Sequence, residues 1–260
     1  MVNEQAIGIF DSGIGGTSIL KEIHALLPHE NLLYLADSKN APYGHKPKSS
    51  IIELSIKNTE FLIEQHCKVI VVACNTATTN AIEILRANYD VPFIGIEPAI
   101  KPAALNSRTK SIGILATKGT LSSALFHKTS DLFARDINVI EKDGEGIVPL
   151  IEKGLAQSKA MRALLTPLLR PMIAAQIDYL VLGCSHYPYL IPILKEMLPA
   201  DISIIDSGAA VAQQTYTILK RNNGLNTKLQ KPKIILYSNG DTEVLKDITD
   251  HSFEVRFKDF

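Results

Sequence analysis

The sequence predicts an α/β fold with two similar lobes, each a mostly parallel sheet flanked by helices, related by pseudo-twofold symmetry. Short runs rich in Ile, Val and Leu alternate with longer helix-like segments, which is typical of parallel strands joined by helices. Several runs are apolar throughout, as expected for strands that helices cover on both faces. An IGI motif begins at Ile7 and at Ile112, and a cysteine ends an apolar run at Cys74 and at Cys184. These nearly equal offsets of 105 and 110 residues favour a duplicated lobe.

The first half of the chain predicts strands over residues 6–10, 32–36, 69–73 and 93–96, with helices over 49–65 and 76–88. The run that begins at Val69 consists of the branched apolar residues that core strands favour. The second half predicts strands over 111–116, 138–141, 179–182, 203–205 and 233–237, with helices over 121–133, 159–176 and 209–221.

The chain crosses between the expected lobes at two places. The first crossing is expected near the segment EPAIKPA, residues 97–103, and the return near IIDSGAA, residues 204–210. We therefore expect residues 1–97 together with 208–260 to form the first lobe and residues 98–207 to form the second. The ligand site is expected in the cleft between them.

Composition excludes several classes of protein. The net charge is zero, so the basic surface of a general nucleic-acid or anionic-membrane binder is absent. The longest apolar runs are far shorter than the roughly 20 residues that span a bilayer, and the N-terminus does not resemble a secretory signal. Three cysteines do not make a disulfide framework. We expect a cytoplasmic enzyme with reduced thiols, acting on a small molecule.

Two cysteines stand where α/β proteins bind ligands, at the carboxyl ends of expected strands. Cys74 is followed by Asn75 and Thr76, and Cys184 is followed by Ser185 and His186. The start of a helix carries partial positive charge, which can lower the pKa of a thiol and hold a substrate carboxylate. The alternative is that each cysteine is a small buried apolar residue. Two cysteines in matched contexts favour function, whereas Cys67 lacks that context and is expected to be structural.

Further candidates lie in loops that follow strands. In FDSGIGG, residues 10–16, Asp11 and Ser12 emerge at a strand end, and the glycines let the backbone approach a ligand closely. This segment matches neither the dinucleotide fingerprint nor the P-loop, and a capped tight turn is the alternative. The remaining candidates are Pro42, Tyr43 and Gly44 in SKNAPYG, Thr117 and Thr120 in ATKGT, and Glu152 in PLIEKG, an isolated glutamate that would not stand out unaided.

A metal site is not expected. His186 stands two residues after Cys184, but zinc takes about four ligands, or three and a water, and no second Cys/His pair has suitable spacing. A histidine that orients or polarises the neighbouring thiol is the better interpretation, with a hydrogen-bonded core histidine as the alternative.

Two thiols from mirrored lobes suggest the inversion of a stereocentre. One group removes a proton from one face of a carbon and the other returns a proton to the opposite face, so one thiol starts as thiolate and the other as thiol. The α-hydrogen of an amino acid is a very weak acid, so the reaction needs a closed, water-excluding site with dipoles aimed at the developing charge.

The motifs FDSGIGG, APYG, ACNTAT and GCSHYP, in this order, resemble those of the glutamate racemase family, in the aspartate/glutamate racemase superfamily. The resemblance spans roughly residues 7–207. It implies a cofactor-independent enzyme that interconverts L- and D-glutamate and supplies D-glutamate for peptidoglycan synthesis and cell shape. It also implies two α/β lobes around the site.

The resemblance implies roles for individual residues. Cys74 is then the acid/base for the D-enantiomer and Cys184 for the L-enantiomer, with Asp11 near the ammonium group or the first thiol. Glu152 and His186 resemble the groups that tune the second thiol. Positions that match substrate contacts are Asp11, Ser12, Pro42, Tyr43, Gly44, Asn75, Thr76, Thr117, Thr120, Ser185 and His186. The family usually has threonine where this chain has Ser185, which keeps the hydroxyl and loses a methyl group.

Several alternatives remain. Aspartate racemases share both cysteines but typically carry an acidic residue where His186 stands, and the DSGIGG start counts against a hydantoin racemase. A two-lobed protein that binds an anionic amino acid without chemistry would use the same helix termini, but it gives no reason for paired thiols. No lysine stands in a convincing Schiff-base setting for a pyridoxal-phosphate enzyme. A homodimer is the common default for such enzymes.

Overall fold

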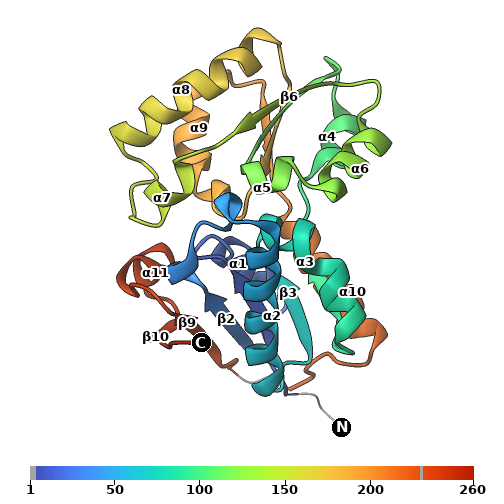
Figure 1. Ribbon diagram of the computed structural model, residues 1–260, viewed down its shortest axis with the longest axis vertical. Helices are drawn as coiled ribbons and strands as arrows, with labels where there is room; N and C mark the ends of the chain where they lie inside the picture. Colours follow the sequence, from blue (N-terminus) through green and yellow to red (C-terminus); the bar gives the residue numbers. More distant parts are fainter. Residues whose placement is uncertain (1–3, 229–230) are drawn as a thin grey trace.

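The computed structural model describes residues 4–228 and 231–260, and it folds into two α/β lobes stacked end to end (Figure 1). Each lobe has one parallel sheet with helices packed around it. The predicted fold class is therefore confirmed. Residues 1–3 and 229–230, which fall within the expected first lobe, lie outside the described residues. Within the described ranges, no helix is both long and apolar enough to cross a membrane.

The larger sheet has the strand order β10-β9-β2-β1-β3-β4, and every adjacent pair is parallel. Its strands are β1 (Ile7–Asp11), β2 (Leu32–Ala36), β3 (Val69–Val72), β4 (Phe93–Gly95), β9 (Ile234–Ser238) and β10 (Glu254–Phe257). The helices of this lobe are α1 (Thr17–Leu26), α2 (Lys48–Glu64), α3 (Asn75–Asn88), α10 (Gly208–Arg221) and α11 (Glu243–Ile248). Two short 3₁₀ turns, η1 (Ser38–Asn40) and η2 (Tyr43–His45), lie between β2 and α2. The three central strands are buried along their whole length, as their apolar sequences require.

The smaller sheet has the strand order β6-β5-β7-β8 and is also parallel throughout. Its strands are β5 (Ser111–Ala116), β6 (Asn138–Asp143), β7 (Tyr179–Gly183) and β8 (Ser203–Ile205). Its helices are α4 (Ile100–Asn106), α5 (Lys118–Leu121), α6 (Ala124–Phe133), α7 (Ile147–Ile151), α8 (Lys159–Ala174) and α9 (Ile191–Met197), and the 3₁₀ turn η3 (Tyr187–Leu190) precedes α9.

One arrangement of four strands occurs in both sheets. The order β2-β1-β3-β4 of the first matches β6-β5-β7-β8 of the second. In the first sheet Ile7 pairs with Val69, and in the second Ile112 pairs with Tyr179. Cys74 and Cys184 each lie five residues beyond the paired position on their strand. The two cysteines therefore occupy equivalent places in the two sheets.

Several elements differ from the sequence prediction. The expected helix over 121–133 is divided into α5 and α6, because the Ser123 side chain accepts a hydrogen bond from the amide of Phe126 and starts a new helix. Helix α1 was not predicted, because the preceding glycines were interpreted only as a turn. The short elements α4, α7, α9, α11 and β10 were also missed.

Candidate active site

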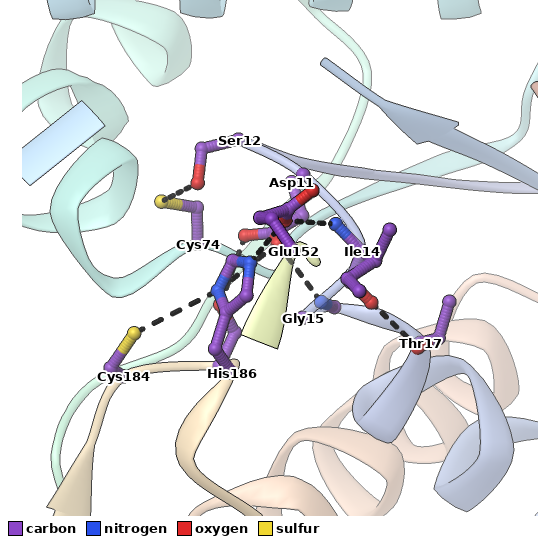
Figure 2. A network of polar contacts seen from close by, with 12 residues as sticks. Asp11, Ser12, Ile14, Gly15, Thr17, Cys74, Glu152, Cys184 and His186 are labelled. Atoms are coloured by element: carbon purple, nitrogen blue, oxygen red, sulfur yellow. Dashed lines mark hydrogen bonds and ion pairs between the residues drawn. The ribbon is translucent and has the colours of Figure 1, made fainter. Parts of the chain in front are cut away.

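The site forms where the carboxyl ends of the two sheets face each other (Figure 2). Asp11 ends β1, Cys74 lies directly after β3, and Cys184 lies directly after β7. Both cysteines are free thiols, 4% and 7% exposed. Parallel sheets bring the ends of neighbouring strands together at one edge, so this convergence follows from the topology.

Cys74 caps helix α3. Its sulfur accepts a hydrogen bond from the amide of Ala77 at 3.4 Å, and its thiol donates toward Ser12 Oγ at 3.6 Å. Burial, with a contribution from the Asp11 carboxylate, raises the pKa of the Cys74 thiol well above its usual range, although the Ala77 amide acts in the opposite direction. The start of α3 thus acts to lower this pKa, as expected, but desolvation outweighs it. The surroundings of Cys74 favour its thiol form.

Cys184 has a cationic neighbour. Its sulfur lies 3.9 Å from His186 Nδ1, and His186 Nε2 donates to Glu152 Oε1 at 2.5 Å (Figure 2). Burial alone would lower the pKa of His186, but the contacts with Cys184 and Glu152 and the charge of Asp11 outweigh it and raise that pKa well above its usual value. These contacts favour the imidazolium form of the ring. A positive N–H group beside a sulfur stabilises a thiolate.

Glu152 joins the two lobes. It follows α7 of the second lobe, yet its Oε1 accepts a hydrogen bond from the amide of Ile14 at 2.7 Å and its Oε2 accepts one from Ser38 Oγ at 3.2 Å. Both donors belong to the larger sheet's lobe. The carboxylate that pairs with His186 is thus held in place by the opposite lobe.

Asp11 is fully buried and accepts hydrogen bonds from both lobes. Its Oδ2 accepts from the amide of Gly16 at 2.9 Å, and its Oδ1 accepts from Ser185 Oγ at 3.0 Å. Oδ2 also lies 3.9 Å from His186 Nδ1. Burial raises the pKa of Asp11, although the charge of His186 acts against this. The hydroxyl of Ser185 therefore binds Asp11, and this contact does not need the methyl group that a threonine would add.

Three threonine hydroxyls meet across the lobes. Thr76 Oγ1 lies 2.9 Å from Thr117 Oγ1 and 3.4 Å from Thr120 Oγ1, and the latter two are 3.1 Å apart. Gly44 packs against Thr117, since an added Cβ would lie 2.8 Å from the threonine Cβ. The side chain of Asn75 is buried, and neither its oxygen nor its nitrogen has a hydrogen-bond partner among the described residues. Such a group is suited to bind a substrate.

Tyr43 and Pro42 differ in what they can offer a ligand. The Tyr43 hydroxyl donates to Asp37 Oδ2 at 2.5 Å and accepts from Asn58 Nδ2 at 3.1 Å. That hydroxyl is already in use, and the Tyr43 carbonyl accepts from the amide of Lys46 at 3.0 Å. Pro42 is half-buried directly before η2 and has no side-chain donor.

Two further site groups were not predicted from the sequence: the amide of Ile14 and the hydroxyl of Ser38. A backbone amide leaves no mark in a sequence, and a loop serine is too common to single out.

Cys67 packs against Gly8 of β1, and burial raises the pKa of its thiol to about 12. Over the described ranges, no group of three or more His, Cys, Asp and Glu side chains could hold a metal ion.

The chain resembles known proteins over most of its length. The model of the Asp/Glu/hydantoin racemase family matches residues 15–215. A glutamate racemase of Cupriavidus pinatubonensis is 47% identical over 82% of this chain and 78% of its own, and one of Pseudomonas syringae pv. tomato is 48% identical over 83% and 79%. A crystal structure of Escherichia coli glutamate racemase in complex with L-glutamate and the activator UDP-MurNAc-Ala superposes with a TM-score of 0.87 at 32% identity, covering 98% of each chain.

Proposed function

Because the chain belongs to the glutamate racemases of the Asp/Glu/hydantoin racemase family, we propose that it interconverts L- and D-glutamate with Cys74 and Cys184 as the two acid/base groups. The observation that carries this proposal is the equivalent position of the two cysteines in two repeated, facing sheets. Groups so related approach one bound carbon from opposite sides, as inversion requires. In the cell the product would be D-glutamate for peptidoglycan, made in the cytoplasm.

The two thiols start in different states. We assign the thiolate to Cys184, whose sulfur lies 3.9 Å from His186 Nδ1, and the thiol to Cys74, whose pKa burial raises. The Cys184 thiolate then removes the α-proton of L-glutamate, and the electron pair of the C–H bond moves into the carboxylate as it becomes enolate-like. The Cys74 thiol returns its proton to the opposite face of the carbon. This step yields D-glutamate, a thiol at Cys184 and a thiolate at Cys74, and the reverse reaction starts from that state.

The remaining residues bind the substrate and exclude water. The unpartnered Asn75 side chain and the start of α3 offer donors for a carboxylate, and Thr76, Thr117 and Thr120 offer hydroxyls. We assign Asp11 to the substrate ammonium group. Ser12, Pro42, Tyr43, Gly44, Ser185 and His186 complete the proposed contacts. The lobes are proposed as residues 1–97 with 208–260, and 98–207, which the sheet membership of the strands supports.

The proposal predicts that each thiol is required. Proton NMR in D₂O would follow the α-proton of each glutamate enantiomer, with circular dichroism in parallel and no added cofactor. The parent protein should exchange deuterium and lose optical rotation, whereas Cys74→Ser and Cys184→Ser should each turn over at least about 10²- to 10⁴-fold more slowly, the usual contribution of a general acid or base.

The structural thiol provides the matched control, and Cys67→Ser should keep its turnover. Glutamate that binds without exchange or inversion would refute the racemase proposal and favour a binding protein. Reaction with aspartate alone would keep the two-thiol mechanism but refute the assignment of glutamate as substrate.

A further inference from the structure

The loop between β2 and α2 supplies groups to both halves of the site. Ser38, at its start, donates to Glu152, which in turn accepts from His186. Further along, Gly44 packs against Thr117 of the other lobe. The path of this loop therefore affects both the tuning of Cys184 and the proposed substrate contacts.

A buried carboxylate, Asp37, holds this loop from inside. Asp37 is 1% exposed and directly follows β2. Its Oδ2 accepts from the Tyr43 hydroxyl at 2.5 Å, and its Oδ1 accepts from Asn40 Nδ2 at 2.8 Å and Asn239 Nδ2 at 2.5 Å. Two of these donors belong to the loop, and the third comes from the other end of the chain. Three hydrogen bonds to one buried side chain therefore fix the loop at Asn40 and Tyr43.

Asn239 directly follows β9, the strand that pairs with β2, and supplies the third hydrogen-bond donor to Asp37. It is 5% exposed, and its amide satisfies groups on both sides: Nδ2 donates to Asp37, and Oδ1 accepts from the backbone amide of Lys39 at 3.0 Å. The backbone amide of Asn239 also donates to the carbonyl of Ala36 at 3.3 Å. The next residue, Gly240, leaves room for Ser38, because a Cβ there would lie 2.9 Å from that of the serine.

We propose that the Asp37–Asn239 pair is the positioning device for the loop that carries Ser38, Tyr43 and Gly44, and that it thereby sets the affinity for glutamate. Neither residue touches the thiols through any hydrogen bond, so both act through the loop. This proposal rests on the proposed racemase function. It adds two positioning residues that the motifs alone do not indicate.

A charge exchange tests the pair directly. In Asp37→Asn alone, an oxygen that still accepts from Tyr43 turns the NH₂ group of residue 37 toward those of Asn40 and Asn239, and Asn239→Asp alone brings two carboxyl groups together. The double variant restores one carboxyl group and one amide: residue 37 can accept from Tyr43 and donate to residue 239, which still accepts from Lys39, and Asn40 keeps its contact by turning its own amide oxygen toward residue 37. Each single change should raise KM for D-glutamate about tenfold or more, with kcat less affected, and the double variant should recover most of that loss.

Asn31 provides a matched control. It joins the same two strands at their opposite ends, accepting from the Lys233 amide at 2.8 Å and donating to the carbonyl of Glu4 at 2.7 Å. Asn31→Ala should lower Tm while KM stays within about twofold of the parent value. Asn239→Ala should raise KM about tenfold, measured at a temperature where both variants remain folded.

Calorimetric titration with D-glutamate gives an independent readout, because racemisation of the bound ligand produces no net heat. The positioning role would be overturned if Asn239→Ala left KM and Kd for D-glutamate unchanged. It would also be overturned if the KM of the double variant were no lower than those of the single variants. Failure of the proposed racemase function can be told apart from failure of the positioning proposal. In the first case the parent protein would bind D-glutamate without turnover, while the variants would still bind it more weakly than the parent in calorimetry.

Discussion

The two thiols are alike in position but not in their surroundings. Cys74 is desolvated and near the Asp11 carboxylate, while Cys184 has the imidazolium of His186, held by Glu152. A two-base reaction requires this difference, because one thiol must hold a proton when the other does not. The repeated strand order gives the two cysteines equivalent positions, while the side chains around them give each thiol a different electrostatic environment.

The raised pKa of His186 makes stability depend on pH. A group whose pKa is higher in the folded state than in the unfolded state stabilises the fold below its unfolded value, about 6.5, and this contribution is lost as pH rises through the folded value. The free energy of unfolding of the parent, minus that of His186→Gln, should therefore shrink as pH rises from about 6.5 through the raised folded-state value. The expected change is about 1.4 kcal/mol for each unit by which folding raises the pKa.

Urea unfolding of both proteins across this pH range would measure the difference. Titration of groups shared by both proteins largely cancels in the comparison. A difference that stays constant with pH would show that His186 is neutral in the folded protein, and the proposed starting state of Cys184 would then lose its basis.

At the scale of elements, the turn between β1 and α1 lies directly against side chains of the second lobe. A Cβ on Gly13 would lie 2.0 Å from Glu152 Oε1, and one on Gly15 would lie 2.3 Å from His186 Nδ1. The glycines were expected to allow close approach of a ligand. In the structure they allow close approach of Glu152 and His186, the residues proposed to tune the second thiol.

Gly13→Ala should therefore impair catalysis more than folding. The methyl group would displace Glu152 from the Ile14 amide and from His186, so kcat/KM should fall about 100-fold or more, in the range for losing a preorganised charged contact. Gly224→Ala is the control, since its Cβ would meet only ordinary contacts of 3.4 Å or longer. A coupled assay for L-glutamate formation, with circular dichroism to confirm folding, would measure both. Equal activity in the two variants would contradict the role assigned to the turn.

Much of the fold could be predicted because its central strands are buried on both faces and leave continuous apolar runs. All nine predicted strands occur, three with the predicted bounds and the others with bounds that differ by at most two residues. Edge and peripheral elements carry weaker signals: β10 is mostly exposed, with a mixed sequence, and α11 is short. Helix α1 shows the opposite case, because its apolar residues are well spaced for a helix, yet the glycine-rich strand-to-helix turn before it gave no bounds for that helix.

The site could be predicted where it consists of side chains in unusual combinations, such as two cysteines after matched strands. It could not be predicted where contacts depend on the meeting of the lobes. The amide of Ile14 and the hydroxyl of Ser38 matter only because Glu152, more than 100 residues away in sequence, reaches them.

At the scale of the whole molecule, the lobes are closed over the thiols. Polar contacts across the junction include Ser18 Oγ to the carbonyl of Ser185 at 3.0 Å and Thr17 Oγ1 with the Tyr189 hydroxyl at 2.6 Å. Cys74 and Cys184 are both less than a tenth exposed, so the proposed reaction needs a route by which glutamate reaches them. We expect the lobes to separate for substrate entry, which would break these contacts.

Thiol modification should report this separation. Cys74 and Cys184 should react with iodoacetamide in the native protein at a rate limited by lobe opening, so the rate should level off as reagent concentration rises, and saturating D-glutamate should slow it about tenfold or more. Cys67 has the same low exposure but packs against Gly8 and Leu62 inside the first lobe, so separation of the lobes does not uncover it, and it should react only after unfolding by denaturant. Mass spectrometry of the modified peptides distinguishes the three sites. Equal rates at all three cysteines, unaffected by D-glutamate, would mean that exposure occurs by global unfolding, and substrate would then need a route other than separation of the lobes.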